Sequence, residues 1–188
     1  MARQLVVILS IFLFSTIMFS CKHHQKQTVT KAKTTQHTKP KQSEKKGSEG
    51  ELVIQEKLGV GLKEIHHDKL LSFVNDWYGV PYKFGGCKKE GVDCSCFVCI
   101  LYETVYQTTL NRTAGEMFKE CAQISANEAR QGDLFFFKIN GDKISHVGVC
   151  LKHNFFVHAS TSKGVMINSI EEAYYKKYFF CAGRIKKT

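Results

Sequence analysis

Asp93-Cys94-Ser95-Cys96-Phe97-Val98-Cys99-Ile100-Leu101-Tyr102 places an aspartate and a cysteine directly before an apolar run. Aspartate is a favourable helix N-cap, so the residues from Cys96 to Val105 are expected to form a buried helix. The Cys94 sulfur would then lie beside the unpaired N–H groups of the first helical turn, which favour the thiolate. We therefore expect a nucleophilic thiol at residue 94, and the alternative is a buried structural cysteine.

A second amphipathic helix is expected just before this stretch. Apolar residues recur at helical spacing between Asp68 and Gly79, where the aspartate is a suitable cap and the glycine a suitable stop. Pro81 then favours an extended exit, and the paired glycines 85 and 86 permit a tight turn with close backbone approach. We interpret the glycines as a turn, because the Lys-Ser or Lys-Thr pair of a phosphate-binding loop does not follow them.

The hydrophobic period changes along the second half of the chain. Thr113–Glu116 and Ser125–Glu128 each match a capping box and are expected to open short helical segments. Consecutive hairpins follow, which favours an antiparallel sheet. The predicted strands cover residues 134–139, 144–151, 155–159, 165–168 and 179–185, with a helix over 171–178. Helices first and strands second predict an α+β fold in which N-terminal helices pack on an antiparallel β-sheet.

Two histidines lie on neighbouring predicted strands. His146 and His158 are separated by one short turn, so their rings are expected to lie side by side. Each is flanked by apolar or small residues, and a polar ring in such surroundings requires a structural or functional explanation. Either histidine alone would be interpreted as a hydrogen-bonded core or surface residue. Together with Cys94 they supply a nucleophile, a base and a residue that orients the base.

The N-terminus has the features of a targeting segment, which we assign to residues 1–21. Arg3 precedes an apolar stretch over residues 5–19, which is shorter than the roughly 20 residues that span a bilayer. The segment ends at Cys21 and resembles the lipobox of bacterial lipoproteins, although bulky Phe19 stands where a small residue is usual. We expect lipidation of Cys21 and anchoring to a membrane of the bacterial envelope, the outer membrane on its periplasmic side. The alternatives are an ordinary secretory signal or a short membrane anchor.

Residues 22–50 differ sharply from the rest in composition. They hold eight lysines, two acidic residues and no aromatic residue, which predicts a basic disordered tether. The formal charge of the whole chain is +10, but residues 51–188 carry only +3, with 18 basic and 15 acidic side chains. We therefore expect no nucleic-acid partner, and we assign residues 51–188 to one catalytic domain.

The chain has eight cysteines. If Cys21 is lipidated and Cys94 is catalytic, an even number remains, which permits disulfides in an exported protein without specifying them. Cys94, Cys96 and Cys99 lack the second ligand pair that is usual in zinc sites. We interpret Cys96 and Cys99 as core residues.

These motifs together resemble the NlpC-type family of papain-like cell-wall cysteine peptidases. Each fragment alone is weak, but they occur in the family order over roughly residues 68–185. The matching fragments are Trp77-Tyr-Gly79-Val-Pro81-Tyr82-Lys-Phe-Gly85-Gly86, Asp93-Cys94-Ser95, Asn111-Arg112-Thr113, Gly132-Asp133-Leu134-Phe135-Phe136, Ser145-His146-Val147-Gly148-Val149 and Phe156-Val157-His158-Ala159-Ser160.

The resemblance implies a role for each matching residue. Cys94 is implied as the nucleophile, His146 as the base and His158 as the polar residue that orients His146. The residues implied to line or support the substrate cleft are Tyr82, Asp93, Ser95 and Arg112. The chain departs from the family at Cys96, where glycine is usual, and a larger side chain there would crowd the helix or form a disulfide.

The implied activity is hydrolysis of amide bonds in peptidoglycan stem peptides through a Cys94 thioester, most often between γ-D-glutamate and a diamino acid. The resemblance implies no metal or organic cofactor. Two alternatives stay open: a catalytically silent peptidoglycan-binding scaffold, and an amidase, acyltransferase or secreted toxin of the same fold. The sequence does not indicate protein partners, oligomeric state or disulfide pairing.

Overall fold

The computed structural model describes residues 42–186. The expected signal segment, Cys21 and residues 22–41 of the expected tether lie outside the described residues. Within residues 42–186, none of the helices combines the length and the apolar character that a membrane span requires.

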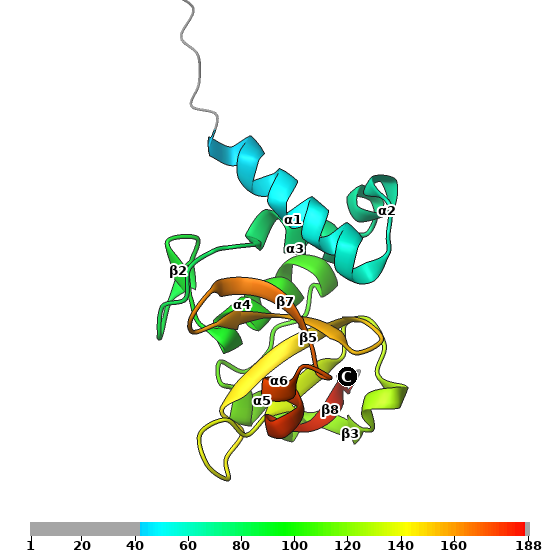
Figure 1. Ribbon diagram of the computed structural model, residues 1–188. Helices are drawn as coiled ribbons and strands as arrows, with labels where there is room; N and C mark the ends of the chain where they lie inside the picture. The colour runs from blue at the N-terminus through cyan, green and yellow to red at the C-terminus, as the bar shows by residue number, and fades with distance from the viewer. Residues whose placement is uncertain (1–41, 187–188) are drawn as a thin grey trace, which may run out of the picture. The chain divides into compact units, whose positions relative to one another are not determined.

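The helices gather mainly in the first half of the described chain and the strands in the second (Figure 1). The helices are α1 (Gln42–Leu58), α2 (Leu62–His67), α3 (Lys69–Trp77), α4 (Cys94–Leu101), α5 (Ala114–Glu120) and α6 (Ala173–Tyr178). The strands are β1 (Cys87–Lys88), β2 (Gly91–Val92), β3 (Cys121–Ile124), β4 (Leu134–Phe137), β5 (His146–Lys152), β6 (Phe155–Ser160), β7 (Gly164–Ser169) and β8 (Phe179–Ile185).

The main sheet has six strands in the order β3-β8-β4-β5-β6-β7, and all of its pairs are antiparallel. β1 and β2 form a separate small hairpin between α3 and α4. The predicted α+β class, with N-terminal helices packed on an antiparallel sheet, is confirmed. The sequence pattern missed β3, because the short segment Cys-Ala-Gln-Ile has no clear alternation and is held as a strand by its pairing with β8.

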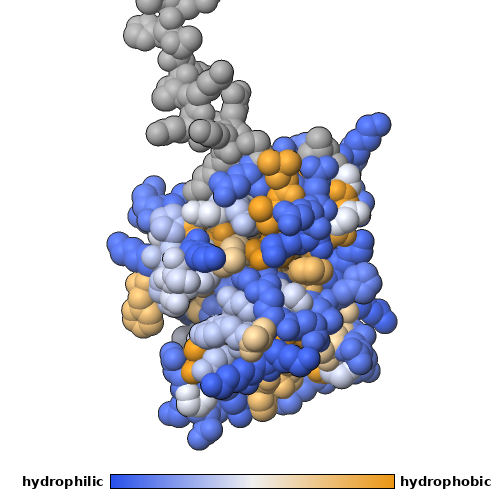
Figure 2. Space-filling model, in the orientation of Figure 1, coloured by the Kyte–Doolittle hydropathy of each residue, from blue (hydrophilic) through white to orange (hydrophobic). Residues whose placement is uncertain are grey.

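The sheet separates two apolar clusters, because successive side chains of a strand point to opposite faces. Leu134 and Phe136 belong to the larger cluster, which also contains the buried residues of α1, α3 and α4. Phe135 and Phe137 belong to a smaller cluster that includes Tyr175 of α6. The face shown in Figure 2 is mostly hydrophilic, with hydrophobic side chains in small patches. The apolar residues of the predicted strands thus pack into apolar clusters on both faces of the sheet.

The expected end of the tether at residue 50 does not match the structure. Helix α1 begins at Gln42 and runs through that boundary to Leu58. Gly50 is buried in the described chain, and a Cβ atom there would lie 2.5 Å from the Asn75 Oδ1 atom. Ile54 is fully buried, so the apolar side of this helix packs on the domain. The polar composition of 42–50 predicted disorder, but a helix whose other end is anchored can extend through polar residues at little cost.

Helix α4 begins as expected but ends differently. The Asp93 side chain accepts a hydrogen bond from the Cys96 N–H at 2.7 Å, which confirms the predicted N-cap. The regular helix stops at Leu101 and continues as a π-helical turn over Tyr102–Tyr106, where one α-helix to Val105 was expected. The buried Tyr102 hydroxyl donates to the Gly132 carbonyl, a contact outside the helix that local sequence pattern does not reveal.

Candidate active site

Cys94 is the first residue of α4 and is buried. The backbone N–H groups of Val147, Ser95 and Cys94 itself point to its sulfur and favour the thiolate. Burial, followed by the negative charge of Asp93, outweighs them and raises the pKa of the Cys94 thiol above its ordinary value. The expectation of a thiol biased toward thiolate is therefore wrong for this structure, because the helix terminus also brings a carboxylate and a desolvated site.

The two predicted histidines meet on neighbouring strands. His146 begins β5, His158 lies within β6, and the Nε2 atom of His146 is 2.8 Å from the Nδ1 atom of His158. Their rings are nearly perpendicular, at 89°. Gly148 allows β6 to pack closely beside His158, since a Cβ atom at residue 148 would lie 2.6 Å from a ring carbon of Phe156, 2.8 Å from the Val157 carbonyl oxygen and 3.1 Å from the His158 Cβ atom. The expected side-by-side placement is confirmed.

Both histidines are held in the neutral form. Burial, then the nearby His158 ring, lowers the pKa of His146 well below its ordinary value. Burial lowers the pKa of His158 to about 4, although Asn168 and the Glu172 charge act in the opposite direction. At neutral pH the site therefore contains a neutral thiol and two neutral imidazoles.

The structure adds partners of His158 that sequence reasoning missed. The His158 Nε2 atom lies 3.0 Å from the Asn168 Oδ1 atom and 3.1 Å from the Tyr175 hydroxyl. Asn168 is a buried polar residue at the end of β7, and the Asn168 Nδ2 atom donates to Glu172 at 2.7 Å. A buried asparagine at the end of an apolar predicted strand was the available signal for this contact. Tyr175 and Glu172 gave no comparable signal, because they come from α6 and reach the site only after folding.

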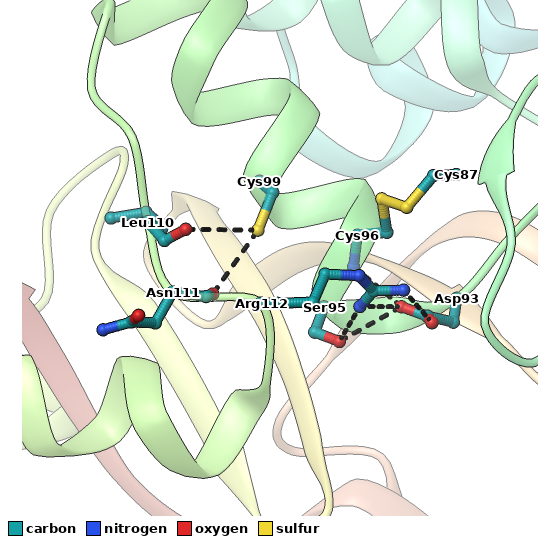
Figure 3. Close-up of a disulfide and its surroundings, with 8 residues drawn as sticks. All are labelled: Cys87, Asp93, Ser95, Cys96, Cys99, Leu110, Asn111 and Arg112. Atoms are coloured by element: carbon teal, nitrogen blue, oxygen red, sulfur yellow. Dashed lines mark hydrogen bonds and ion pairs between the residues drawn. A yellow bond between two sulfur atoms is a disulfide. The ribbon is translucent and has the colours of Figure 1, made fainter.

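A charged network surrounds the start of α4 on another side (Figure 3). The Arg112 guanidinium donates to the two Asp93 carboxylate oxygens at 2.6 and 3.0 Å and to the Ser95 hydroxyl at 2.8 Å. Burial by itself would raise the pKa of Asp93. The net pKa is nevertheless below the ordinary value, because the carboxylate accepts hydrogen bonds from Arg112, the Cys96 N–H and Ser95 and lies next to the Arg112 charge. Asp93 is thus a carboxylate at neutral pH, and the structure brings these three predicted residues together.

A cleft of about 620 Å³ opens onto Cys94, His146 and His158. Tyr82 lines this cleft as expected, and its backbone pairs with Val92 in an isolated parallel bridge. Burial raises the pKa of Tyr82, and the negative charges of Asp93 and of Cys94 in its ionised form at high pH act in the same direction. The three residues of the charged network are outside the set that lines the cleft. The other lining residues are Phe84, Ile139, Asn140, Ser145, Ser160, Thr161, Ser162, Lys163, Met166, Asn168, Tyr174 and Tyr175.

Cys96 forms a disulfide with Cys87, and the two Cα atoms are 5.5 Å apart. The bond joins the β1–β2 hairpin to the first turn of α4 (Figure 3). The core prediction for Cys96 is correct about burial, and of the two expected consequences of a larger side chain at this position the structure shows the disulfide. The identity of its partner was left open, because Cys87 comes from a hairpin that cysteine spacing alone does not select. Cys99 is a free, half-buried thiol that donates to the carbonyls of Leu110 and Asn111. Among residues 42–186, no cluster of three or more His, Cys, Asp or Glu side chains is arranged to hold a metal ion.

Comparison with known proteins identifies the family. The model of the NlpC/P60 family matches residues 79–184. The probable endopeptidase NlpC of Escherichia coli K12 is 41% identical over 113 residues, which cover 60% of this chain and 73% of that protein. The murein DD-endopeptidase MepS/murein LD-carboxypeptidase of the same strain is 41% identical over 117 residues, which cover 62% of each chain.

A solved structure gives the same result for the fold. A protein of Staphylococcus aureus Mu50, described as similar to a lipoprotein of the NLP/P60 family, superposes with a TM-score of 0.58 at 26% identity. The superposition covers 69% of this chain and 43% of that chain.

Proposed function

The chain belongs to the NlpC/P60 family, and on this premise we propose that it is a peptidoglycan hydrolase, a cysteine endopeptidase that cleaves amide bonds of stem peptides. The observation that carries the proposal is the convergence of Cys94, His146 and His158 on one cleft. Cys94 is the nucleophile, His146 the general base and acid, and His158 the residue that orients His146.

The first half of the reaction forms a thioester. Because thiol and imidazole are both neutral before substrate binds, the thiol proton passes to His146 as the sulfur attacks the carbonyl carbon. The Nδ1 atom of His146 receives this proton, since its Nε2 atom is engaged with His158. The backbone N–H of Cys94 donates to the oxyanion of the tetrahedral intermediate. When the C–N bond breaks, His146 returns the proton to the leaving amine.

The second half of the reaction releases the acid product. His146 takes a proton from water, and the hydroxide attacks the thioester carbonyl carbon. Collapse of this second tetrahedral intermediate breaks the C–S bond, and the sulfur regains a proton from His146. The charged network acts outside the cleft: Asp93 caps α4, and Arg112 holds Asp93 and Ser95 in place. Tyr82 contacts the bound peptide from the cleft wall.

The cleft has the charge that an acidic peptide requires. Among its lining residues, all within the described part of the chain, Lys163 is the one residue of the types lysine, arginine, aspartate and glutamate. Stem peptides carry free carboxylates, so a lysine is complementary to them.

We assign cleavage to the bond between γ-D-glutamate and the diamino acid. The second candidate is the cross-link between stems, because a relative that is 41% identical is named a murein DD-endopeptidase.

The N-terminal segment supports a place in the bacterial envelope. We include in the proposal a lipid anchor on Cys21 that holds the domain at the outer membrane on its periplasmic side. Residues 22–41 would connect this anchor to the domain. Incorporation of labelled palmitate into the wild-type chain and its loss in Cys21→Ala would support the anchor. Equal labelling of both chains, or none in either, would contradict it.

Muropeptide digestion tests the activity. Purified full chain is incubated with defined muropeptides, and the products are identified by mass spectrometry under reducing and oxidising conditions. Wild type and Cys99→Ala are expected to cleave at similar rates, whereas Cys94→Ala is expected to leave the substrate intact. Cys99 is the matched control, because it is a free thiol of the same helix that does not line the cleft.

The masses of the fragments identify the bond that is cut. Cleavage by Cys94→Ala at the wild-type rate would contradict the mechanism. Muropeptide binding by the wild type without cleavage in either redox state would favour the peptidoglycan-binding scaffold. Release of the whole peptide from the glycan would favour the amidase.

A further inference from the structure

A chain of hydrogen bonds continues from the paired histidines to the surface. The Nε2 atom of His158 is 3.0 Å from the Asn168 Oδ1 atom, and the Asn168 Nδ2 atom is 2.7 Å from the Glu172 Oε2 atom. Asn168 and His158 are buried, whereas Glu172 lies at the exposed start of α6. A carboxylate at the surface is thus connected through one amide to the buried residue that contacts His146.

The Glu172 carboxylate fixes which group donates and which accepts in each of these hydrogen bonds. An ionised carboxylate only accepts hydrogen bonds, so the group of Asn168 that faces Glu172 must be its NH₂. The Asn168 carbonyl oxygen then faces His158, and this oxygen also only accepts. Hence the Nε2 atom of His158 must carry the proton. The Tyr175 hydroxyl, 3.1 Å from the same nitrogen, is a second acceptor for that N–H.

The direction is transmitted to His146. A neutral imidazole with its proton on Nε2 has a lone pair on Nδ1, so the Nδ1 atom of His158 accepts. Its partner at 2.8 Å is the Nε2 atom of His146, which must therefore donate. The Nδ1 atom of His146 is left without a proton, and this is the form that a general base needs.

We propose that Glu172 is a positioning residue that, through Asn168, selects the tautomers of His158 and His146 and leaves the His146 Nδ1 lone pair free for the Cys94 thiol. The inference rests on the proposed function, in which His146 is the base. Glu172 is not a catalytic residue, since it does not line the cleft. It acts through two hydrogen-bonded residues.

The Glu172 side chain is itself fixed for this task. Its Oε1 atom accepts from the Ser169 N–H at 2.8 Å while its Oε2 atom accepts from Asn168. Both oxygens are therefore in use, and both contacts require an acceptor. Glutamine has the same shape but only one oxygen, so Glu172→Gln leaves either the Ser169 N–H or the Asn168 NH₂ facing another donor. Rotation of the Asn168 amide by half a turn relieves the conflict, and the rotated amide then favours the opposite tautomer of His158.

Glu171 is a matched control. It is the neighbouring residue, is also exposed, and pairs with Lys176 at 2.9 Å instead of with Asn168. Glu171→Gln removes the same charge from the same segment without touching the chain of hydrogen bonds. Glu172→Asp is the conservative variant, because it retains two acceptor oxygens on a shorter side chain.

The experiment combines ring ¹⁵N NMR of the histidines with steady-state kinetics on the full chain. Wild type and Glu171→Gln are expected to show His158 protonated on Nε2 and His146 protonated on Nε2. Glu172→Gln is expected to lose this pattern and to lower kcat by about ten-fold to 100-fold, within the roughly 10²–10⁴-fold that a general base contributes. Its KM is expected to change by less than about two-fold, because no substrate contact is removed. Glu172→Asp is expected to restore most of both readouts.

The outcomes separate this inference from the proposed function. Unchanged histidine tautomers in a folded Glu172→Gln chain would overturn the inference, even if muropeptide cleavage is observed. A fall in kcat that is equal in Glu172→Gln, Glu172→Asp and Glu171→Gln would overturn it as well, since it would indicate only a structural role for this segment. An inactive wild type with the expected tautomers would count against the proposed hydrolysis, but the positioning by Glu172 would be supported by NMR alone.

Discussion

Two polar networks meet near Cys94, and they are built in opposite ways. The network of Asp93, Ser95 and Arg112 is charged, and its arginine side chain is 44% exposed. The network of His146, His158 and Asn168 is neutral and buried, and its residues lie on β5, β6 and β7. The charged network holds the start of α4, whereas the neutral network holds the His146 ring. In the proposed mechanism, the charged network positions the sulfur and the neutral network accepts its proton.

The difference bears on how a buried Cys94 thiol acts in the proposed mechanism. Asp93 keeps its charge because Arg112 compensates it, and this charge opposes ionisation of Cys94. The histidines stay neutral because burial dominates their pKa values, and within residues 42–186 neither ring is hydrogen-bonded to a carboxylate. Proton transfer from sulfur to nitrogen is therefore expected with bound substrate, when the developing oxyanion is stabilised.

Mild acid is expected to act on the neutral network first and to have the largest effect on stability. The pKa of His158 is about 4 in the folded chain and about 6.5 when unfolded. The unfolded chain therefore binds more protons between these values, and the histidine contribution is complete above pH 6.5 and is lost as the pH falls toward 4. We expect up to about 3 kcal/mol of unfolding free energy to be lost in this window. Urea unfolding at a series of pH values measures it.

The charged network is expected to respond only at lower pH. The pKa of Asp93 is lowered, so its contribution is present above its unfolded value of 3.8 and is lost as the pH falls through the lower folded value. A His158→Asn variant is expected to lose much of the dependence between pH 6.5 and 4. If the free energy of unfolding of the wild type is the same at pH 7 and pH 4.5, the account of buried neutral histidines is wrong.

A methyl group at residue 148, beside His158, is expected to disturb the neutral network. In Gly148→Ala the new Cβ atom would lie 2.6 Å from a ring carbon of Phe156, 2.8 Å from the Val157 carbonyl oxygen and 3.1 Å from the His158 Cβ atom, so the Phe156 ring and the β6 backbone must shift. We expect a loss of about 1–3 kcal/mol of stability together with a fall in kcat. Thermal unfolding and muropeptide kinetics measure the two effects.

Gly115→Ala is the control for this substitution. Gly115 lies in α5, and among residues 42–186 the nearest atom to its added Cβ outside the helix's own backbone and the adjacent residues is the Ile144 carbonyl oxygen at 3.9 Å. This variant is expected to be unchanged in activity and about 0.4–1 kcal/mol more stable. An equal loss in both variants would show that the close contacts of a Cβ atom at residue 148 are not the cause of the loss.

Two ion pairs of similar geometry are expected to show whether Arg112 positions the active site or only stabilises the fold. Arg112 with Asp93 and Arg184 with Asp133 have similar geometry, with shortest N···O distances of 2.6 and 2.7 Å. Their arginine side chains are 44% and 40% exposed. Arg112→Gln is expected to lower kcat/KM by about ten-fold, because Asp93 and Ser95 next to the nucleophile lose their partner, whereas Arg184→Gln leaves it unchanged. Equal kcat/KM values in the two variants would contradict a positioning role for Arg112.

The sequence predicted those parts of the site that depend on neighbours in the chain. Asp93 caps α4 because a carboxylate three residues before an N–H can reach it in any helix. His146 and His158 meet because two strands joined by a short turn must pair. The family, first inferred from motifs such as Asp93-Cys94-Ser95, is confirmed by the match to residues 79–184. The fold class followed from the same local patterns.

Other features required contacts between distant segments. The disulfide of Cys96 depends on where the β1–β2 hairpin brings Cys87, and cysteine spacing does not select a partner. Asn168 joins the histidines only because β7 pairs with β6. The tether boundary was wrong because the helix through Gly50 is held by packing against α3 and not by its own composition.

By itself, the sequence determined which residues are candidates for the proposed chemistry and on which helix or strand Cys94 and the two histidines lie, because capping and strand periodicity act over a few neighbouring residues. The tertiary structure alone decided the charge states and the directions of the hydrogen bonds. Burial raises the pKa of Cys94 and lowers that of His146. Desolvation depends on every atom packed around a group, and those atoms come from all parts of the chain.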